Sequence, residues 1–162
     1  MWGAISEKGF AEILIHKEKK VTSDEWCQAL EAGKMQQVIK KLNPRSSHGP
    51  WHMLCDGESF LHTPASRQAY KAAKIKVWKV PAKSPDLNPI EKYWAWLRKQ
   101  LRDRDFSDLK AGKPVPGKMA YVRRLRNILR SAKAQKVAGN CAKSLRKVCL
   151  EVKKKGGAAS RS

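Results

Sequence analysis

Short apolar runs alternate with amphipathic stretches along roughly the first 105 residues, and this order constrains the fold more than any other feature of the chain. Apolar runs of strand length cover residues 1–6, 10–16, 51–56 and 75–80. Stretches with apolar residues at helical spacing cover residues 22–42 and 64–74 and begin again at Asn88. The order strand, strand, helix, strand, helix, strand, helix predicts an α/β layer, in which helices pack on a sheet.

The first two long helices carry recognisable start signals. Thr22 with Glu25 three residues later forms a capping-box pattern, and we expect its helix to run to about Leu42, weakened in the middle by Gly33. The later helix has Asn88 as its expected N-cap, and Glu91 falls in the third helical position. Its expected apolar stripe is Ile90, Trp94, Leu97 and Leu101.

Positive charge is distributed very unevenly. Lys and Arg number 35 against 14 Asp and Glu, which gives a formal net charge of +21. Residues 1–60 carry 8 basic and 8 acidic side chains, so residues 61–162 supply the whole excess. From Lys110 onward there are 16 basic side chains against Glu151 alone. This asymmetry indicates a polyanionic partner, with nucleic acid as the first candidate and a merely solvated surface as the alternative.

Several classes of protein are disfavoured by the same sequence. No run approaches the ~20 apolar residues of a membrane span, and the first residues lack the basic and apolar segments of a secretory signal. We therefore expect neither a membrane protein nor a secreted one. The four cysteines lie far apart without a CxxC pair, so reduced thiols are expected rather than a disulfide framework or a zinc ribbon.

The basic C-terminal part reads as two amphipathic helices after a Gly/Pro-rich linker at residues 111–117. We expect Met119, Val122, Leu125 and Leu129 to form the apolar stripe of the first helix, and Leu145, Val148, Cys149 and Val152 that of the second. Basic side chains beside these stripes are candidates for phosphate contacts that position the chain without reading sequence. The candidate nucleic-acid-binding residues are Lys83, Arg123, Arg124, Arg126, Arg130, Lys143, Arg146 and Lys147.

The segment from Pro81 to Trp94 is the most specific motif. Its core, Ser84-Pro85-Asp86-Leu87-Asn88-Pro89-Ile90-Glu91, resembles the signature that closes the catalytic core of mariner/Tc-type DDE transposases and their insertion-sequence relatives. The Trp2-Gly3-Ala4-Ile5-Ser6 run is similar to a strand of the same family, and Asp56 ends a strand as that family's second catalytic aspartate does. His62 resembles the histidine that follows this aspartate, although the intervening residues are longer and lack Ala-Pro.

This resemblance implies a fold and a site. It implies an α/β, ribonuclease H-like mixed sheet with flanking helices and a basic helical C-terminal extension. Asp56 and Glu91 would be catalytic and would hold Mg²⁺ or Mn²⁺, because two such ions can activate a nucleophile and stabilise a leaving oxygen during phosphodiester cleavage. The expected organisation is a partial endonuclease domain at 1–109, a linker at 110–117 and a basic helical extension with a frayed tail at 118–162.

The resemblance also implies a gap. The family's first catalytic aspartate lies on a strand upstream of the WGAIS-like strand, and this sequence begins at Met1-Trp2-Gly3. We therefore expect the first strand and its aspartate to be missing, with unpaired strand edges and impaired catalysis as consequences. Glu7 and Glu12 lie on the wrong elements to replace it.

Structural interpretations remain open beside the functional ones. Glu91 occupies the position at which an acid caps a helix, and Asp56 alone is an ordinary strand-end acid. His48, His52, Cys55 and Asp56 suggest zinc only weakly, because His52 and Cys55 would point to opposite faces of a strand. Trp26 and Trp94 fit apolar stripes, whereas Trp96 falls off its stripe and is a candidate for exposure.

Together these features predict a transposase endonuclease domain that cleaves and joins DNA with divalent metal. The alternative from another class is a non-catalytic nucleic-acid-binding fragment or derivative of a transposase, and RNA binding is a third option. DNA is the expected partner, with a homodimer on paired transposon ends. The basic clusters suggest a nuclear location in a eukaryote and otherwise a cytoplasmic one.

Overall fold

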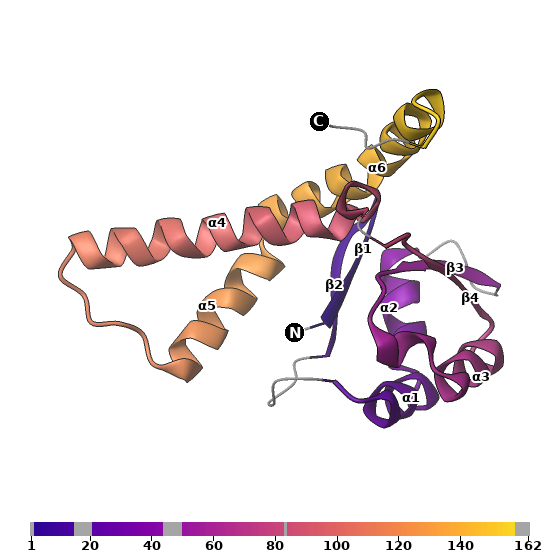
Figure 1. Ribbon diagram of the computed structural model, residues 1–162. Coiled ribbons are helices and arrows are strands. Elements are labelled where there is room, and N and C mark those ends of the chain that lie inside the picture. The colour runs from indigo at the N-terminus through magenta and orange to yellow at the C-terminus, as the bar shows by residue number, and fades with distance from the viewer. Residues whose placement is uncertain (1, 15–20, 44–49, 83, 158–162) are drawn as a thin grey trace.

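The computed structural model describes residues 2–14, 21–43, 50–82 and 84–157. These residues form four strands, six α-helices and two short 3₁₀ helices (Figure 1). The strands are β1 (Trp2–Ser6), β2 (Gly9–Leu14), β3 (Trp51–Cys55) and β4 (Ile75–Lys79). The α-helices are α1 (Ser23–Glu31), α2 (Lys34–Leu42), α3 (Pro64–Ala72), α4 (Pro89–Lys110), α5 (Lys118–Arg130) and α6 (Ala132–Lys154), and the 3₁₀ helices are η1 (Ser59–His62) and η2 (Pro85–Leu87).

The strands pair in two separate sheets rather than one. β1 and β2 form an antiparallel hairpin, and β3 and β4 form a parallel pair in which Cys55 lies opposite Lys79. The expected α/β class is confirmed. The expectation of one mixed sheet is not met among the described residues, because no hydrogen-bonded strand joins β1 to β3. Helix α3 connects β3 to β4, which is the kind of crossover that a parallel pair needs.

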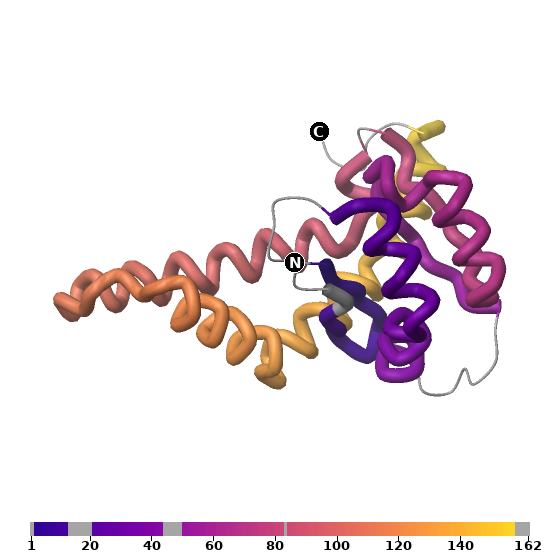
Figure 2. The backbone as a smooth tube through the Cα atoms, turned by 90° about the horizontal axis from the view of Figure 1, so that it is seen from below, coloured from indigo at the N-terminus to yellow at the C-terminus, as the bar shows by residue number. Residues whose placement is uncertain are grey.

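The hairpin separates two apolar cores (Figures 1 and 2). Successive side chains of a strand point to opposite faces, so Ala11 packs with α1, α2 and the β3–β4 sheet, while Phe10 packs with α4, α5 and α6. Trp26 is fully buried in the first core and donates its indole N–H to the Tyr70 hydroxyl at 2.7 Å. Phe10 stacks on Tyr93 in the second core, with ring centroids 5.2 Å apart.

The expected helix over residues 22–42 is two helices. The capping box at its start forms as expected: the Thr22 hydroxyl accepts from the Glu25 N–H, and the Glu25 carboxylate accepts from the Thr22 N–H. Gly33 then takes a φ of 72°, a left-handed conformation that ends α1 and starts α2. The prediction of one continuous helix was therefore wrong, because the glycine turns the chain instead of merely weakening it.

The C-terminal helices share a core with the first part of the chain. α6 contacts both strands of the hairpin as well as α4, and Gly139 lies so close to the hairpin turn that a Cβ there would be 2.7 Å from the Glu7 carbonyl oxygen. α4 and α5 extend away from this body as an arm, joined by residues 111–117 (Figure 1). The predicted apolar role of Met119 was wrong: its side chain is 78% exposed, because the start of α5 lies on this arm.

Candidate functional site

A cleft of about 620 Å³ lies between the hairpin and the β3–β4 sheet. Its walls come from β1 and β3, and Asn88, Pro89 and Ile90 at the start of α4 line it as well. Asp56, the residue directly after β3, also lines it. The end of β3 and the beginning of a long helix, 32 residues apart between Asp56 and Asn88, therefore meet at one cleft.

Asp56 is held by its backbone as well as by its own side chain. The Asp56 carbonyl oxygen lies 2.7 Å from His62 Nε2, so that nitrogen carries the proton and donates. The Asp56 carboxylate accepts a long hydrogen bond of 3.4 Å from the Glu58 N–H and is only partly buried. His62 thus connects η1 to the end of β3 and fixes the backbone from which the Asp56 carboxylate projects.

Cys55, the last residue of β3, lies in a more buried environment than the adjacent Asp56. Its thiol is buried against Tyr70 and the first core. Burial first, and the neighbouring Asp56 charge second, raise the pKa of Cys55 to about 12. The thiol therefore stays protonated at neutral pH, and the next residue carries the negative charge at this point of the cleft.

Glu91 occupies the third position of α4, as expected, but does not close a capping box. Asn88 stands at the N-cap and its side chain makes no capping hydrogen bond. Within the described ranges, the exposed Glu91 carboxylate has neither a hydrogen bond nor an ion pair. Since the capping interpretation needs such a bond, the Glu91 carboxylate remains available, with the positive end of the α4 dipole behind it.

The described residues do not assemble a complete metal site. Among them, no three His, Cys, Asp or Glu side chains converge closely enough to hold a metal ion. Asp56 lines the cleft, whereas Glu91 does not, although Pro89, Ile90 and Trp94 of the same helix line it. Two carboxylates with nearby water fit the hard oxygen ligation that Mg²⁺ prefers, although they are sparse ligation for it. For the zinc interpretation, His48 lies outside the described residues, and His52 instead accepts a hydrogen bond from Trp78.

An exposed aromatic pair, Trp78 and His52, lies on the β3–β4 sheet. Trp78 of β4 is 61% exposed and donates its indole N–H to His52 Nδ1 at 3.1 Å, with the two rings nearly parallel. Strict alternation along residues 75–80 would have placed Trp78 on the face opposite Val77, which is the one signal that pointed to it. Trp96, expected as a candidate for exposure, is half-buried and stacks on Tyr93.

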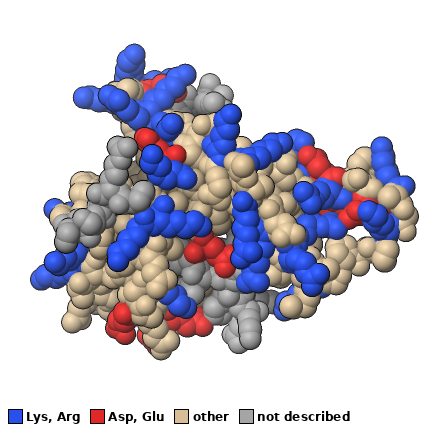
Figure 3. Space-filling view, turned by 180° about the vertical axis from the view of Figure 1, so that it is seen from behind, with Lys and Arg blue, Asp and Glu red and all other residues tan. Residues whose placement is uncertain are grey.

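Most of the predicted nucleic-acid-binding residues are exposed. The space-filling view in Figure 3 shows Lys and Arg side chains spread over much of one face, with smaller acidic patches between them. Arg123, Arg126 and Arg130 are exposed on α5, and Lys143, Arg146 and Lys147 on α6. Arg124 differs: its guanidinium is only 17% exposed and pairs with Asp105 and Asp108 of α4, so it ties two helices together. Lys83 lies outside the described residues.

Comparison with protein families places the chain in a class. Residues 1–112 match the DDE superfamily endonuclease family, so the chain belongs to that family. It is also 31% identical over 97 residues to the Tc3 transposase, a transposable-element protein of Caenorhabditis elegans. That similarity covers 60% of this chain and 28% of the length of the relative. The family resemblance of the Ser84–Glu91 motif is thereby confirmed. No helix in the described part of the chain has the length and apolar character needed to cross a bilayer.

Proposed function

We propose that this chain is the part of a DNA transposase that carries two of its catalytic carboxylates, Asp56 and Glu91, and that it acts on DNA phosphodiesters with divalent metal. The observation that carries the proposal is the meeting of the end of β3 and the start of α4 at one cleft. The Glu91 carboxylate, unpaired within the described residues, adds support. Family membership and the similarity to a transposase make this chemistry the expected one.

The two carboxylates would hold Mg²⁺ or Mn²⁺. The bound ion would supply charge relief at phosphorus and an activated oxygen nucleophile. The chain's own residues have separate tasks: His62 steadies the Asp56 backbone, and the first turn of α4 presents Glu91 with a favourable dipole. The buried, protonated Cys55 thiol adds no competing charge beside Asp56.

The cleft also favours a ribonuclease H-like arrangement with one further strand. Among the described residues, β1 pairs on one side only, with β2, and β3 pairs on one side only, with β4. Both open edges face the same cleft. We propose that a strand between them would complete a mixed sheet and bring a third carboxylate to Asp56 and Glu91. Without it, these 162 residues should bind Mg²⁺ weakly and cut DNA poorly.

Metal binding by the whole chain tests the assignment. We expect calorimetric titration with MnCl₂ to give weak binding that is lost in Asp56→Asn and in Glu91→Gln. Glu31→Gln is the matched control, because Glu31 is an exposed acid at the end of α1 that does not line the cleft. Unchanged Mn²⁺ binding in both site variants would refute the assignment.

Plasmid nicking tests the impaired catalysis separately. We expect the chain to convert supercoiled plasmid to open circles slowly in Mn²⁺ and not at all in EDTA. Rapid nicking that Glu91→Gln abolishes would keep Asp56 and Glu91 as the site but contradict the impairment.

A second candidate function rests on the basic half of the chain: non-catalytic binding of nucleic acid. Sixteen basic side chains from Lys110 onward, against Glu151 alone, favour it. Under this alternative, DNA affinity is salt-sensitive, survives Asp56→Asn and needs no metal, and nicking is absent. A higher affinity for RNA in the same competition would instead favour the RNA-binding option.

The organisation and setting of the protein follow as further proposals. The division into 1–109, 110–117 and 118–162 stays a prediction, and the shared second core shows that α6 packs with the first part. Pairing of two copies on two transposon ends and a nuclear location in a eukaryote are likewise proposed. Size-exclusion chromatography with and without end-sequence DNA would test the pairing.

A further inference from the structure

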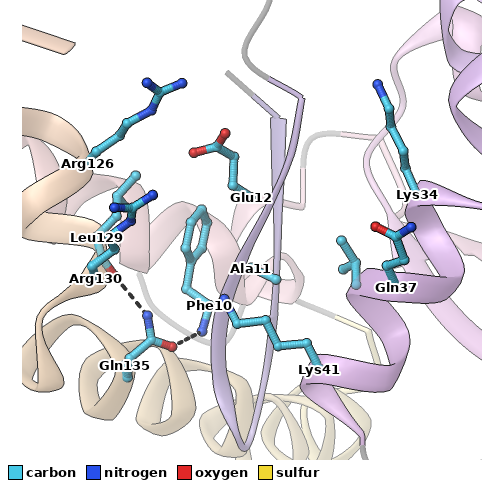
Figure 4. A pocket seen from close by; sticks show the side chains of 11 residues that line it. Phe10, Ala11, Glu12, Lys34, Gln37, Lys41, Arg126, Leu129, Arg130 and Gln135 are labelled. Carbon is cyan, nitrogen blue, oxygen red and sulfur yellow. Dashed lines mark hydrogen bonds between the residues drawn. The ribbon is translucent and has the colours of Figure 1, made fainter. Parts of the chain in front are cut away.

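A second cleft, of about 730 Å³, lies on the other strand of the hairpin. Its floor is Phe10, Ala11 and Glu12 of β2. One wall is a face of α2, with Lys34, Gln37, Val38 and Lys41, and the other is a face of α5, with Arg126, Leu129 and Arg130 (Figure 4). Val38 is the only residue that it shares with the lining of the Asp56 cleft, so the two clefts are distinct among the described residues.

Four cations line this cleft on two helices that are far apart in the sequence. Lys34 and Lys41 come from α2, and Arg126 and Arg130 from α5. All four are exposed, and none forms an ion pair within the described part of the chain. Converging like charges repel one another and oppose the compact state. An anion bound in the cleft would relieve this repulsion.

The spacing of these cations fits a row of charges rather than one. Lys34 and Lys41 are seven residues apart on one face of α2, which corresponds to about 10 Å along the axis. Arg126 and Arg130 are one turn apart on α5, or about 6 Å. A nucleic-acid strand presents phosphates at regular intervals along its backbone, whereas a single phosphate would leave part of this set without a partner.

The α5 wall is fixed to the floor by one side chain. Gln135 of α6 accepts a hydrogen bond from the Phe10 N–H at 2.9 Å and donates to the Leu129 carbonyl at 2.8 Å (Figure 4). Gly9 is required beside it: its φ is 126°, and a Cβ there would be 2.3 Å from Gln135 Oε1. The cations on α5 are thus held next to β2 before any ligand arrives, which lowers the entropic cost of binding.

The floor of the cleft indicates which part of a nucleic acid would be recognised, the bases or the phosphates. Phe10 and Ala11 are buried, so the floor presents no exposed aromatic ring for a base to stack on. Glu12 is the single acid among the lining residues and repels phosphate locally. Recognition would therefore rest on backbone phosphates and be independent of sequence.

We propose that this cleft binds the phosphate backbone of DNA at a site separate from Asp56 and Glu91. The cleft grips one strand of a duplex between α2 and α5, and it does so without metal. The inference uses DNA as partner but does not depend on any chemistry at the two carboxylates.

A pair of charge-matched double variants tests the cleft. Lys41→Gln with Arg126→Gln removes one cation from each wall. Lys40→Gln with Lys118→Gln is the control, because both residues are exposed on the same two helices and neither lines the cleft. The readout is fluorescence anisotropy with a labelled 30-base-pair duplex in EDTA, titrated at several NaCl concentrations.

We expect the cleft variant to lose about tenfold in affinity and to reduce the magnitude of the salt slope by about 2, one for each lost phosphate contact. The control variant should keep the wild-type slope. Glu12→Gln should raise the affinity by removing a local repulsion. Equal losses in the two double variants would overturn the proposal, since they would show only the effect of overall charge.

Two further measurements keep the outcome unambiguous. Thermal unfolding of both double variants should match that of the wild-type chain, because all four substituted side chains are exposed. Micromolar tripolyphosphate that displaces the duplex from wild type but not from the cleft variant would overturn the DNA-backbone assignment in favour of a small anion. Anisotropy is measured in EDTA and the Mn²⁺ titration of Asp56 and Glu91 involves none of the substituted cations, so failure at the carboxylates and failure at the cleft remain distinguishable.

Discussion

The two halves of α4 are one continuous helix in two different environments. In the first half, Tyr93 and Leu97 are buried in the second core, and Leu101, just beyond this half, is the last buried residue of the helix. In the second half, Phe106 is 58% and Leu109 72% exposed, and the helix projects with α5 as an arm (Figure 1). The end that carries Glu91 is therefore positioned by apolar packing, and the far end is not.

Beyond Leu101, ion pairs and not buried apolar side chains hold α4 to its neighbours. Arg124 of α5 bridges Asp105 and Asp108 of α4, and Lys113 in the connection also pairs with Asp108. Such pairs near the surface are individually weak and are screened by salt. The comparison teaches that the candidate site belongs to a firmly held part of α4, whereas the arm is held by contacts that solution conditions can weaken.

The largest expected effect on stability comes from truncating a buried leucine in the first half of α4. Leu97→Ala should lower the free energy of unfolding by about 2–5 kcal/mol, through lost burial and the cavity left behind. Leu109→Ala on the arm should change it by less than about 0.5 kcal/mol. Urea denaturation followed by far-UV circular dichroism measures both. Similar values for the two variants would erase the distinction between the halves of α4.

A smaller and local effect is expected from Arg124→Gln. The substitution removes the bridge between α4 and α5, so amide hydrogen exchange in the first turns of α5 should become several-fold faster. Exchange around Leu97 should stay the same. Arg123→Gln is the matched control, being an exposed neighbour that makes no such bridge. Protection of α5 that survives Arg124→Gln would show that the arm has another source of order.

Lowering the pH should also weaken the ion pairs between α4 and α5. Slight desolvation raises the pKa of Asp108, but hydrogen bonds and charge from Lys113 and Arg124 outweigh it, so the pKa of Asp108 is lowered overall. A lowered pKa stabilises the folded arm above the ordinary aspartate range, and this contribution is lost as the pH falls through the lowered value. Exchange in α5 should therefore quicken in that acidic window. Asp108→Asn should abolish the pH dependence, and a dependence that persisted would assign it to another group.

The smallest effect should come from salt alone. Raising NaCl from low to near-molar concentration shortens the screening length several-fold, so it should modestly accelerate exchange in the arm. Amides around Tyr93 should not respond, because their environment is apolar. Equal responses in both regions would mean that salt acts on global stability instead.

Much of the fold was predictable because its signals are local. The capping box at Thr22, the start of α4 after Asn88 and all four strands follow from short-range patterns. Gly33 was noticed, but its left-handed backbone is a property of conformation that periodicity does not reveal. Met119 fits an apolar stripe in sequence and is still exposed, because a stripe predicts burial only where another surface faces it.

The candidate site was predictable to a different degree. The family resemblance selected Asp56 and Glu91, and the structure brings the end of β3 and the start of α4 to one cleft. The ion pairs of Arg124 with α4 and the exposed Trp78–His52 pair depend on tertiary neighbours, which a single sequence does not specify. The same holds for the α2–α5 cleft, whose cations are separated by more than eighty residues of chain.

The bond from the Phe10 amide to Gln135 has a consequence for association between molecules. A strand whose outward amides are left open recruits other strands, which is a route to aggregation. Here the Gln135 side chain of α6 occupies the Phe10 N–H on the outer edge of β2. This contact opposes the pairing of a strand from another molecule with β2. Growth of the sheet is thereby directed to the β1 border, the one that adjoins Asp56.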